Sequence, residues 1–96
     1  MRSRYSALFE RMASADPDAR DFAFDEVLLD RERALPALIE GYHKYRDQPD
    51  LRFMLVQLMG FTNVRAAVPA VVAALEDHDP YIRAEAWRAL EDLLAL

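Results

Sequence analysis

Pro80-Tyr81-Ile82-Arg83 is the third copy of a motif that also stands at Pro17-Asp18-Ala19-Arg20 and at Pro49-Asp50-Leu51-Arg52. The three prolines lie 32 and then 31 residues apart. A constant period of this length is typical of a chain built from stacked copies of one supersecondary unit. The sequence therefore predicts a single repeat domain, with repeats at about 1–31, 32–63 and 64–96, and not a bundle of independent helices.

Each motif follows a stretch in which apolar residues recur at i, i+3, i+4 and i+7, the spacing of one helix face. The three stretches are Tyr5/Leu8/Phe9/Met12, Leu35/Leu38/Ile39/Tyr42 and Val68/Val71/Val72/Leu75. One unit is then a first helix, a short turn, and a second helix opened by the proline, whose missing N–H is no loss there. Asp16 and Asp79 precede two of the prolines, and we expect them to cap these helices.

The second helices are predicted to carry apolar stripes of their own, at Leu51/Leu55/Leu58/Met59 and at Ile82/Ala86/Ala89/Leu90. In the first unit, Glu26 falls where the other units have an apolar residue. Either this helix is rotated or it lies at an open end of the stack. In the rotated arrangement, part of the contact would pass to Phe22, Phe24, Leu28 and Leu29.

The pattern resembles the HEAT-repeat family, in the short-repeat form similar to that of the phycobilisome lyases. The residues that carry the resemblance are 66–75, 77–83, Ala86, Ala89 and Leu90 in the last copy, and 34–39 and 51–60 in the middle copy. The resemblance implies an all-α fold, a right-handed α-solenoid of three HEAT-like helix pairs. It also implies a ladder in which a turn aspartate and the arginine that opens the second helix pair along the stack. Asp77 and Arg83 match this ladder, Asp47 and Arg52 match it with a shifted spacing, and Ser14 with Arg20 breaks it.

Composition narrows the class of protein. The 96 residues suffice for one domain, and no apolar run approaches the roughly 18 residues of a membrane span. With 53% hydrophobic residues, only two glycines and no secretory signal pattern, we expect a soluble, cytoplasmic protein. Cysteine is absent, which excludes disulfides and thiolate metal sites. The net charge of −5 disfavours nucleic acid as a partner, because phosphate binding depends on clustered cations.

Few residues carry a signal for chemistry. His78 lies between Asp77 and Asp79, but three adjacent side chains cannot all point to one metal ion, and His43 stands apart from them. Neighbouring carboxylates such as Glu91 and Asp92 project about 100° apart on a helix and do not form an acid–base pair. We therefore expect a protein that is not an enzyme and has no catalytic residue, metal site or cofactor.

The candidate interaction residues are apolar and aromatic residues that the repeat pattern does not use, together with arginines on or beside the second helices. They include aromatic and arginine side chains, the types enriched in interface cores: Arg52, Phe53, Phe61, Arg83, Trp87, Arg88 and Leu94. On the last helix, Arg83, Trp87, Leu90 and Leu94 form a flank that a following repeat would cover, which suggests a possible homodimer through the C-terminal repeat. The alternative is that Trp87 folds back near Val72 or Leu75. For Phe53, the alternative is a local cluster with Tyr45 that orders the turn before Pro49.

These observations favour a non-catalytic protein–protein interaction or scaffold module that uses the surface of its second helices. The resemblance implies an alternative, an accessory relative of the tetrapyrrole lyases. A third reading, HEAT-like nucleic-acid binding, agrees least with the acidic charge.

Overall fold

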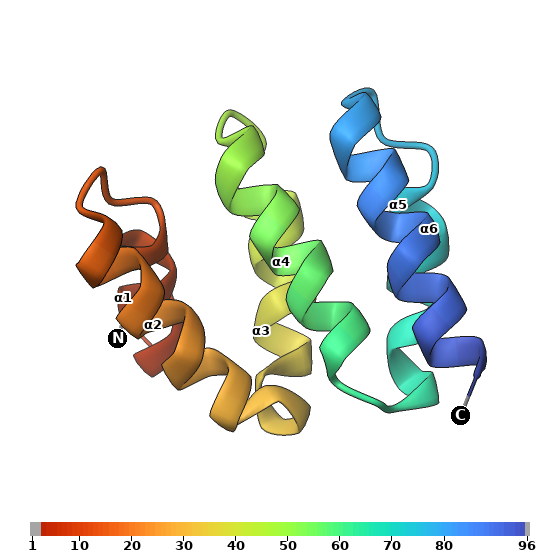
Figure 1. Cartoon of the computed structure of the whole chain (residues 1–96), viewed down its shortest axis with the longest axis horizontal. Helices are drawn as coiled ribbons and strands as arrows, with labels where there is room; N and C mark the ends of the chain where they lie inside the picture. The colour runs from red at the N-terminus through yellow and green to blue at the C-terminus, as the bar shows by residue number, and fades with distance from the viewer. Residues whose placement is uncertain (1–2, 96) are drawn as a thin grey trace.

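The computed structural model describes residues 3–95, and within this range the chain is helical, without a strand. Its elements are α1 (Arg4–Met12), α2 (Pro17–Leu29), α3 (Arg31–Lys44), α4 (Pro49–Phe61), the 3₁₀ turn η1 (Arg65–Ala67), α5 (Val68–Ala74) and α6 (Pro80–Leu94). Figure 1 shows three helix pairs side by side, with α2, α4 and α6 toward the viewer and the two chain ends at opposite ends of the row. The predicted all-α solenoid of three helix pairs is confirmed.

The second helices begin as the sequence predicts. Each starts at its proline, and the caps of two of them come from the preceding aspartates. Asp16 Oδ1 accepts the N–H of Asp18 at 3.0 Å, and Asp79 Oδ1 accepts the N–H of Tyr81 at 2.8 Å. These bonds satisfy N–H groups that have no partner inside the helix. Gln48 makes no such side-chain bond before α4.

The core contains most of the predicted stripe residues. Among the buried side chains are Leu8, Phe9, Met12, Leu35, Leu38, Leu51, Leu55, Leu58, Met59, Val71, Ile82, Ala86, Ala89 and Leu93. Val72 differs, because 45% of it is exposed. Ala70 and Ala73 of α5 face a cleft toward α3. Val72 projects from the opposite side of α5, and so it lies at the end of the stack.

The second helix of the first pair buries less than its counterparts. Ala23 and Val27 face the core, and the carboxylate of Glu26 lies 3.3 Å from Nη2 of Arg4 in α1. Phe24 and Leu28 pack partly against the core. Phe22 and Leu29 remain 55% and 82% exposed, so they do not take over the contact that Glu26 interrupts.

Two glycines mark close approaches between helices. A Cβ added at Gly60 of α4 would lie 2.7 Å from the Cβ and 2.9 Å from the Cα of Ala89 in α6. A Cβ at Gly41 of α3 would lie 3.1 Å from Leu55 Cδ1 and from Phe9 Cε2, so α3 also packs closely on its neighbours. The backbone of α6 therefore packs directly on that of α4 and fixes the third pair against the second.

Candidate interaction surfaces

A buried ion pair joins the second and third helix pairs. Arg52 lies in the first turn of α4, and Asp77 lies in the turn between α5 and α6. Nη2 of Arg52 donates to Oδ2 of Asp77, and the two side chains are 7% and 1% exposed. Buried charges of this kind need close pairing, because water no longer compensates them.

Asp77 is the centre of a larger cluster. Its carboxylate accepts the hydroxyl of Tyr42 and, at 2.9 Å, the N–H of Asp79, while its backbone carbonyl accepts Nη1 of Arg83 at 2.8 Å. Burial alone would raise the pKa of Asp77, but these hydrogen bonds and the charge of Arg52 outweigh it and lower the pKa below its usual range. Burial and the bond to Asp77 raise the pKa of Tyr42 to about 12, so its hydroxyl stays a donor.

This cluster shows how the ladder residues lie. Asp77 bonds to the arginine of the preceding pair, Arg52, and holds Arg83 through its backbone. Asp47 is exposed, and no hydrogen bond or ion pair joins it to Arg20 within residues 3–95. Tyr5 Oη of α1 donates to Oδ2 of Asp30, the residue between α2 and α3. Arg52 was predicted both as an interaction residue and as a ladder residue. It is only 5% accessible and donates to Asp77, so it lies in the ladder and is not available on the surface.

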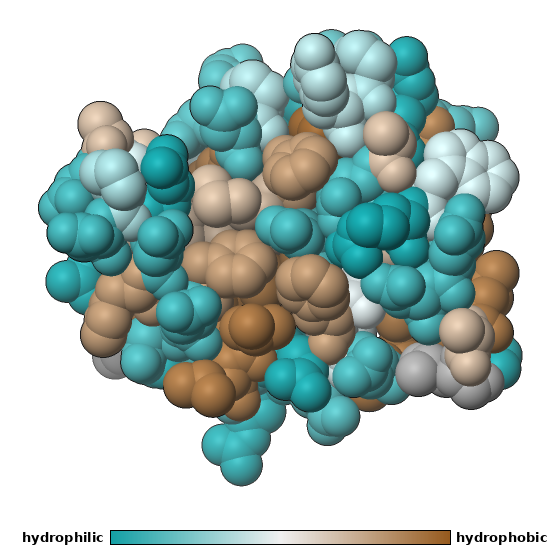
Figure 2. All heavy atoms as spheres, in the orientation of Figure 1, coloured by the Kyte–Doolittle hydropathy of each residue, from teal (hydrophilic) through white to brown (hydrophobic). Residues whose placement is uncertain are grey.

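A second feature is an apolar surface between two second helices, defined by Phe24 and Leu28 of α2 and Met54 and Phe61 of α4. We call it the α2–α4 surface. Phe24 and Met54 line one hollow of about 240 Å³, and Leu28 and Phe61 line another of about 490 Å³. Figure 2 shows brown and tan side chains gathered over this part of the face, surrounded by hydrophilic ones. All four residues are half-buried.

The other predicted interaction residues on the second helices differ in how accessible their side chains are to a partner. Phe53 is half-buried against the core, and Tyr45 meets the ring of Phe9 edge-on at 6.4 Å. The guanidinium of Arg88 lies 5.1 Å from the centre of the Phe61 ring and is held by Glu85 and by Asp92, whose Oδ2 lies 2.7 Å from Nη1. Arg88 therefore supports Phe61 and offers little free hydrogen-bonding capacity.

The outer face of α6 is the third candidate surface. Trp87 and Leu94 are 57% and 56% exposed, and Arg83 is exposed beside them. Leu90, on the same flank, is half-buried. Trp87 does not take the folded-back position that would bury it, and Val72 is likewise open.

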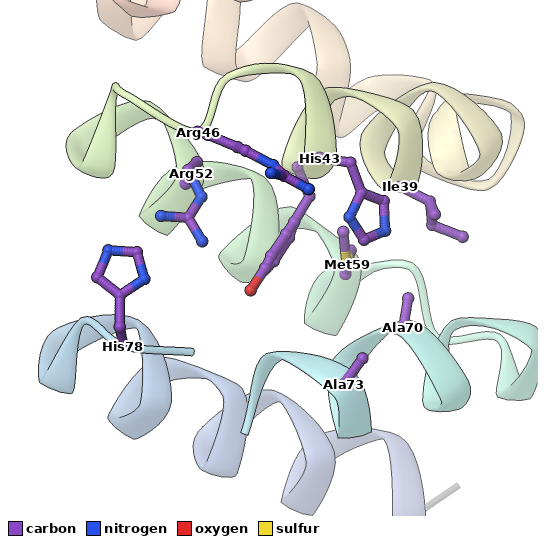
Figure 3. A pocket seen from close by; sticks show the side chains of 9 residues that line it. Ile39, His43, Arg46, Arg52, Met59, Ala70, Ala73 and His78 are labelled. Atoms are coloured by element: carbon purple, nitrogen blue, oxygen red, sulfur yellow. The ribbon is translucent and has the colours of Figure 1, made fainter. Parts of the chain in front are cut away.

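A cleft of about 310 Å³ lies between α3 and α5, and it was not predicted from the sequence. Figure 3 shows His43 and Arg46 reaching toward it from α3 and the following turn, with His78 on the opposite side. Arg52 and Met59 lie between them. The sequence held one indication of this cleft: both histidines stand near the end of a first helix, so neighbouring repeats bring them to the same level of the stack.

A family model of HEAT repeats matches residues 35–93, which run from α3 to α6. The chain belongs to the HEAT-repeat family. The match takes in the second and third helix pairs with the Arg52–Asp77 bond between them, and it leaves out α1 and α2. HEAT repeats commonly mediate protein–protein interaction. The comparison with curated proteins found no match.

Two further observations concern what the described part of the chain contains. None of its helices has both the length and the apolar character needed to cross a membrane. Within residues 3–95, no group of three His, Cys, Asp or Glu side chains is placed to hold a metal ion.

Proposed function

We propose that this HEAT-repeat chain is a non-catalytic module that binds an apolar segment of another protein on the α2–α4 surface. The observation that carries the proposal is the row of half-buried Phe24, Leu28, Met54 and Phe61 over two adjacent helices. Phenylalanine and methionine are enriched in interface cores. Contiguous apolar surface on a protein marks a place where another molecule binds.

Charged side chains border this surface at both ends. Arg20 and Asp21 line the hollow beside Phe24 and Met54, and Arg31 and Asp92 line the hollow beside Phe61. A polar rim around an apolar centre is the usual arrangement of a protein interface. Both charges are present, so the rim selects a partner by the position of its own charges and not by net charge alone.

The test is photo-crosslinking in cells of the source organism. A photoreactive residue at Gln57, which lines the hollow with Met54, should capture a partner, and Met54→Glu should abolish the crosslink. The matched control is the same residue at Glu40, an exposed position on α3. Equal capture at both positions, or capture that survives Met54→Glu, would remove the α2–α4 surface from consideration. Purified protein titrated with a linear tetrapyrrole should show no absorbance change, since a shift would favour the lyase-like alternative.

We also propose that the outer face of α6 forms a weak homodimer. This is supported by Trp87 and Leu94, which lie 57% and 56% exposed on one flank of the last helix. The same patch on two copies can pair about a twofold axis, the commonest symmetry of homo-oligomers. The expected contact is separate from the α2–α4 surface, so a dimer would leave that surface open.

A further inference from the structure

The cleft between α3 and α5 follows from the short third pair. Helix α5 has seven residues, against fourteen in α3, and it turns the small side chains of Ala70 and Ala73 toward the gap. Helix α3 packs on α1 and α4 but makes little contact with α5. The first helices of the last two pairs therefore do not close on each other, and a space of about 310 Å³ remains.

The lining of the cleft combines an apolar base with an edge made of one arginine and two histidines. Ile39, Met59, Ala70 and Ala73 form its apolar part. Arg46 and the two histidines lie at its edge, and all three are exposed. The Asp77 carboxylate lies beneath it, bonded to Tyr42 and Arg52, and the described lining itself includes no carboxylate. Arg46 therefore supplies the positive charge at this edge, and the two histidines add polar ring nitrogens.

The wall of the cleft is held in place by the buried cluster beneath it. The ring of His43 stacks on that of Tyr42, with centres 5.3 Å apart and planes at 16°. Tyr42 is fixed by its bond to Asp77, and the guanidinium of Arg52 lies 4.9 Å from the centre of its ring. Arg52 lines the cleft, is 5% exposed, and has no acceptor for its Nε within residues 3–95. Tyr42, His43 and Arg52 are thus held in place before a ligand binds, which reduces the entropic cost of binding.

We propose that this cleft binds the C-terminal carboxylate of a partner protein whose last residue is apolar. The carboxylate is placed between Arg46 and His78, where charge-assisted hydrogen bonds form. The terminal side chain lies on Ala70, Ala73 and Met59. Both parts of the ligand are required, because the cleft offers one cationic edge and one apolar base.

The open shape of the cleft favours a protein terminus over a free small molecule. Sites for free ligands span about 300–1,000 Å³ and cover most of the ligand surface. This cleft is at the small end of that range, and the side chain of His78 at its edge is 84% exposed. A ligand that continues into a larger chain gains further contacts outside the cleft. The cleft opens between the first helices α3 and α5, and it shares no lining residue with the α2–α4 surface.

The experiment is a titration of the ¹⁵N-labelled protein, followed by NMR, with an N-acetylated peptide Gly-Ser-Gly-Ser-Leu that has a free C-terminal carboxylate. Amide shifts should change in residues 39–46 and 70–78. The same peptide with a C-terminal amide should bind about tenfold more weakly, because the charged acceptor is lost. Octanoate is the probe for a free acid. Octanoate binding tighter than the peptide, or equal binding of the peptide acid and amide, would overturn the proposal.

Three variants test the residues. Arg46→Ala and His78→Ala each remove an exposed side chain at the cleft edge, and each should weaken the peptide acid about tenfold. Lys44→Ala is the matched control: it removes an exposed cation of the same segment that lies outside the cleft, over the ring of Tyr45. It should change the affinity less than about twofold, since an exposed charge outside the site is largely screened. Equal weakening by Lys44→Ala and Arg46→Ala would show unspecific attraction and refute the site.

Discussion

The Arg52–Asp77 bond leads to a quantitative prediction about stability. Asp77→Ala would remove the acceptor of three donors, the guanidinium of Arg52, the hydroxyl of Tyr42 and the N–H of Asp79. Breaking a buried ion pair on one side costs about 3–5 kcal/mol, because the remaining charge stays buried and unpaired. At roughly 0.05–0.15 kcal/mol per residue, a chain of this length has about 5–15 kcal/mol in total. We expect Asp77→Ala to lose at least about a fifth of the stability.

The assay is urea denaturation followed by circular dichroism at 222 nm. Asp77→Asn separates the contributions, because its amide oxygen can still accept the N–H of Asp79 but brings no charge to Arg52. It should cost nearly as much as Asp77→Ala. The double variant Arg52→Met with Asp77→Leu replaces both charges by apolar groups and should be more stable than Asp77→Ala.

The matched control is Asp47→Ala, the exposed aspartate of the preceding turn, with an expected effect within about 0.5 kcal/mol. The reasoning fails if Asp77→Ala costs less than about 1.5 kcal/mol, the worth of one ordinary hydrogen bond. It fails equally if Asp47→Ala costs as much as Asp77→Ala.

Three further predictions concern pH, packing and association. The pKa of Asp77 is lowered in the folded protein, so its carboxylate contributes fully to stability above the unfolded pKa of about 4. This contribution is lost as the pH falls through the lower pKa of the folded state. Between pH 6 and pH 3, the urea midpoint should therefore fall less in Asp77→Asn than in the parent. Gly60→Ala should destabilise the protein by about 1–3 kcal/mol, because the new Cβ would meet the α6 backbone. Gly41→Ala should be nearly neutral, because only side-chain tips would have to move and alanine gains up to about 1 kcal/mol in helix propensity. Similar urea midpoints for the two variants would contradict this. Trp87→Glu should abolish any concentration-dependent dimer in sedimentation equilibrium without changing the circular dichroism, and a strictly monomeric parent would end the dimer proposal.

The sequence was sufficient for the elements that depend on local rules. Proline at a helix start and aspartate before it act within one turn, so the starts of α2 and α6 could be predicted residue by residue. The spacing of apolar residues likewise identified the buried side of α4 and of α6. Val72 shows the limit of this reasoning, because a stripe does not reveal whether a neighbouring helix exists to cover its edge.

Features that depend on the distance between helices could not be predicted. The resemblance placed Arg52 in the ladder, but its burial against Asp77 depends on the approach of the α5–α6 turn. The cleft depends on the difference in length between α3 and α5 and on how far the two diverge, which no local pattern encodes. The row of apolar residues on α2 and α4 required the relative rotation of two helices that Glu26 left undecided.

The position of Asp77 also bears on how the protein folds during its synthesis. Arg52 leaves the ribosome 25 residues before Asp77, so its guanidinium lacks this partner while the second helix pair forms. The face of α4 that later meets Ala89 is open over the same stage. A nascent chain that has emerged only as far as the second pair would therefore lack both the carboxylate that pairs with Arg52 and the helix that covers α4.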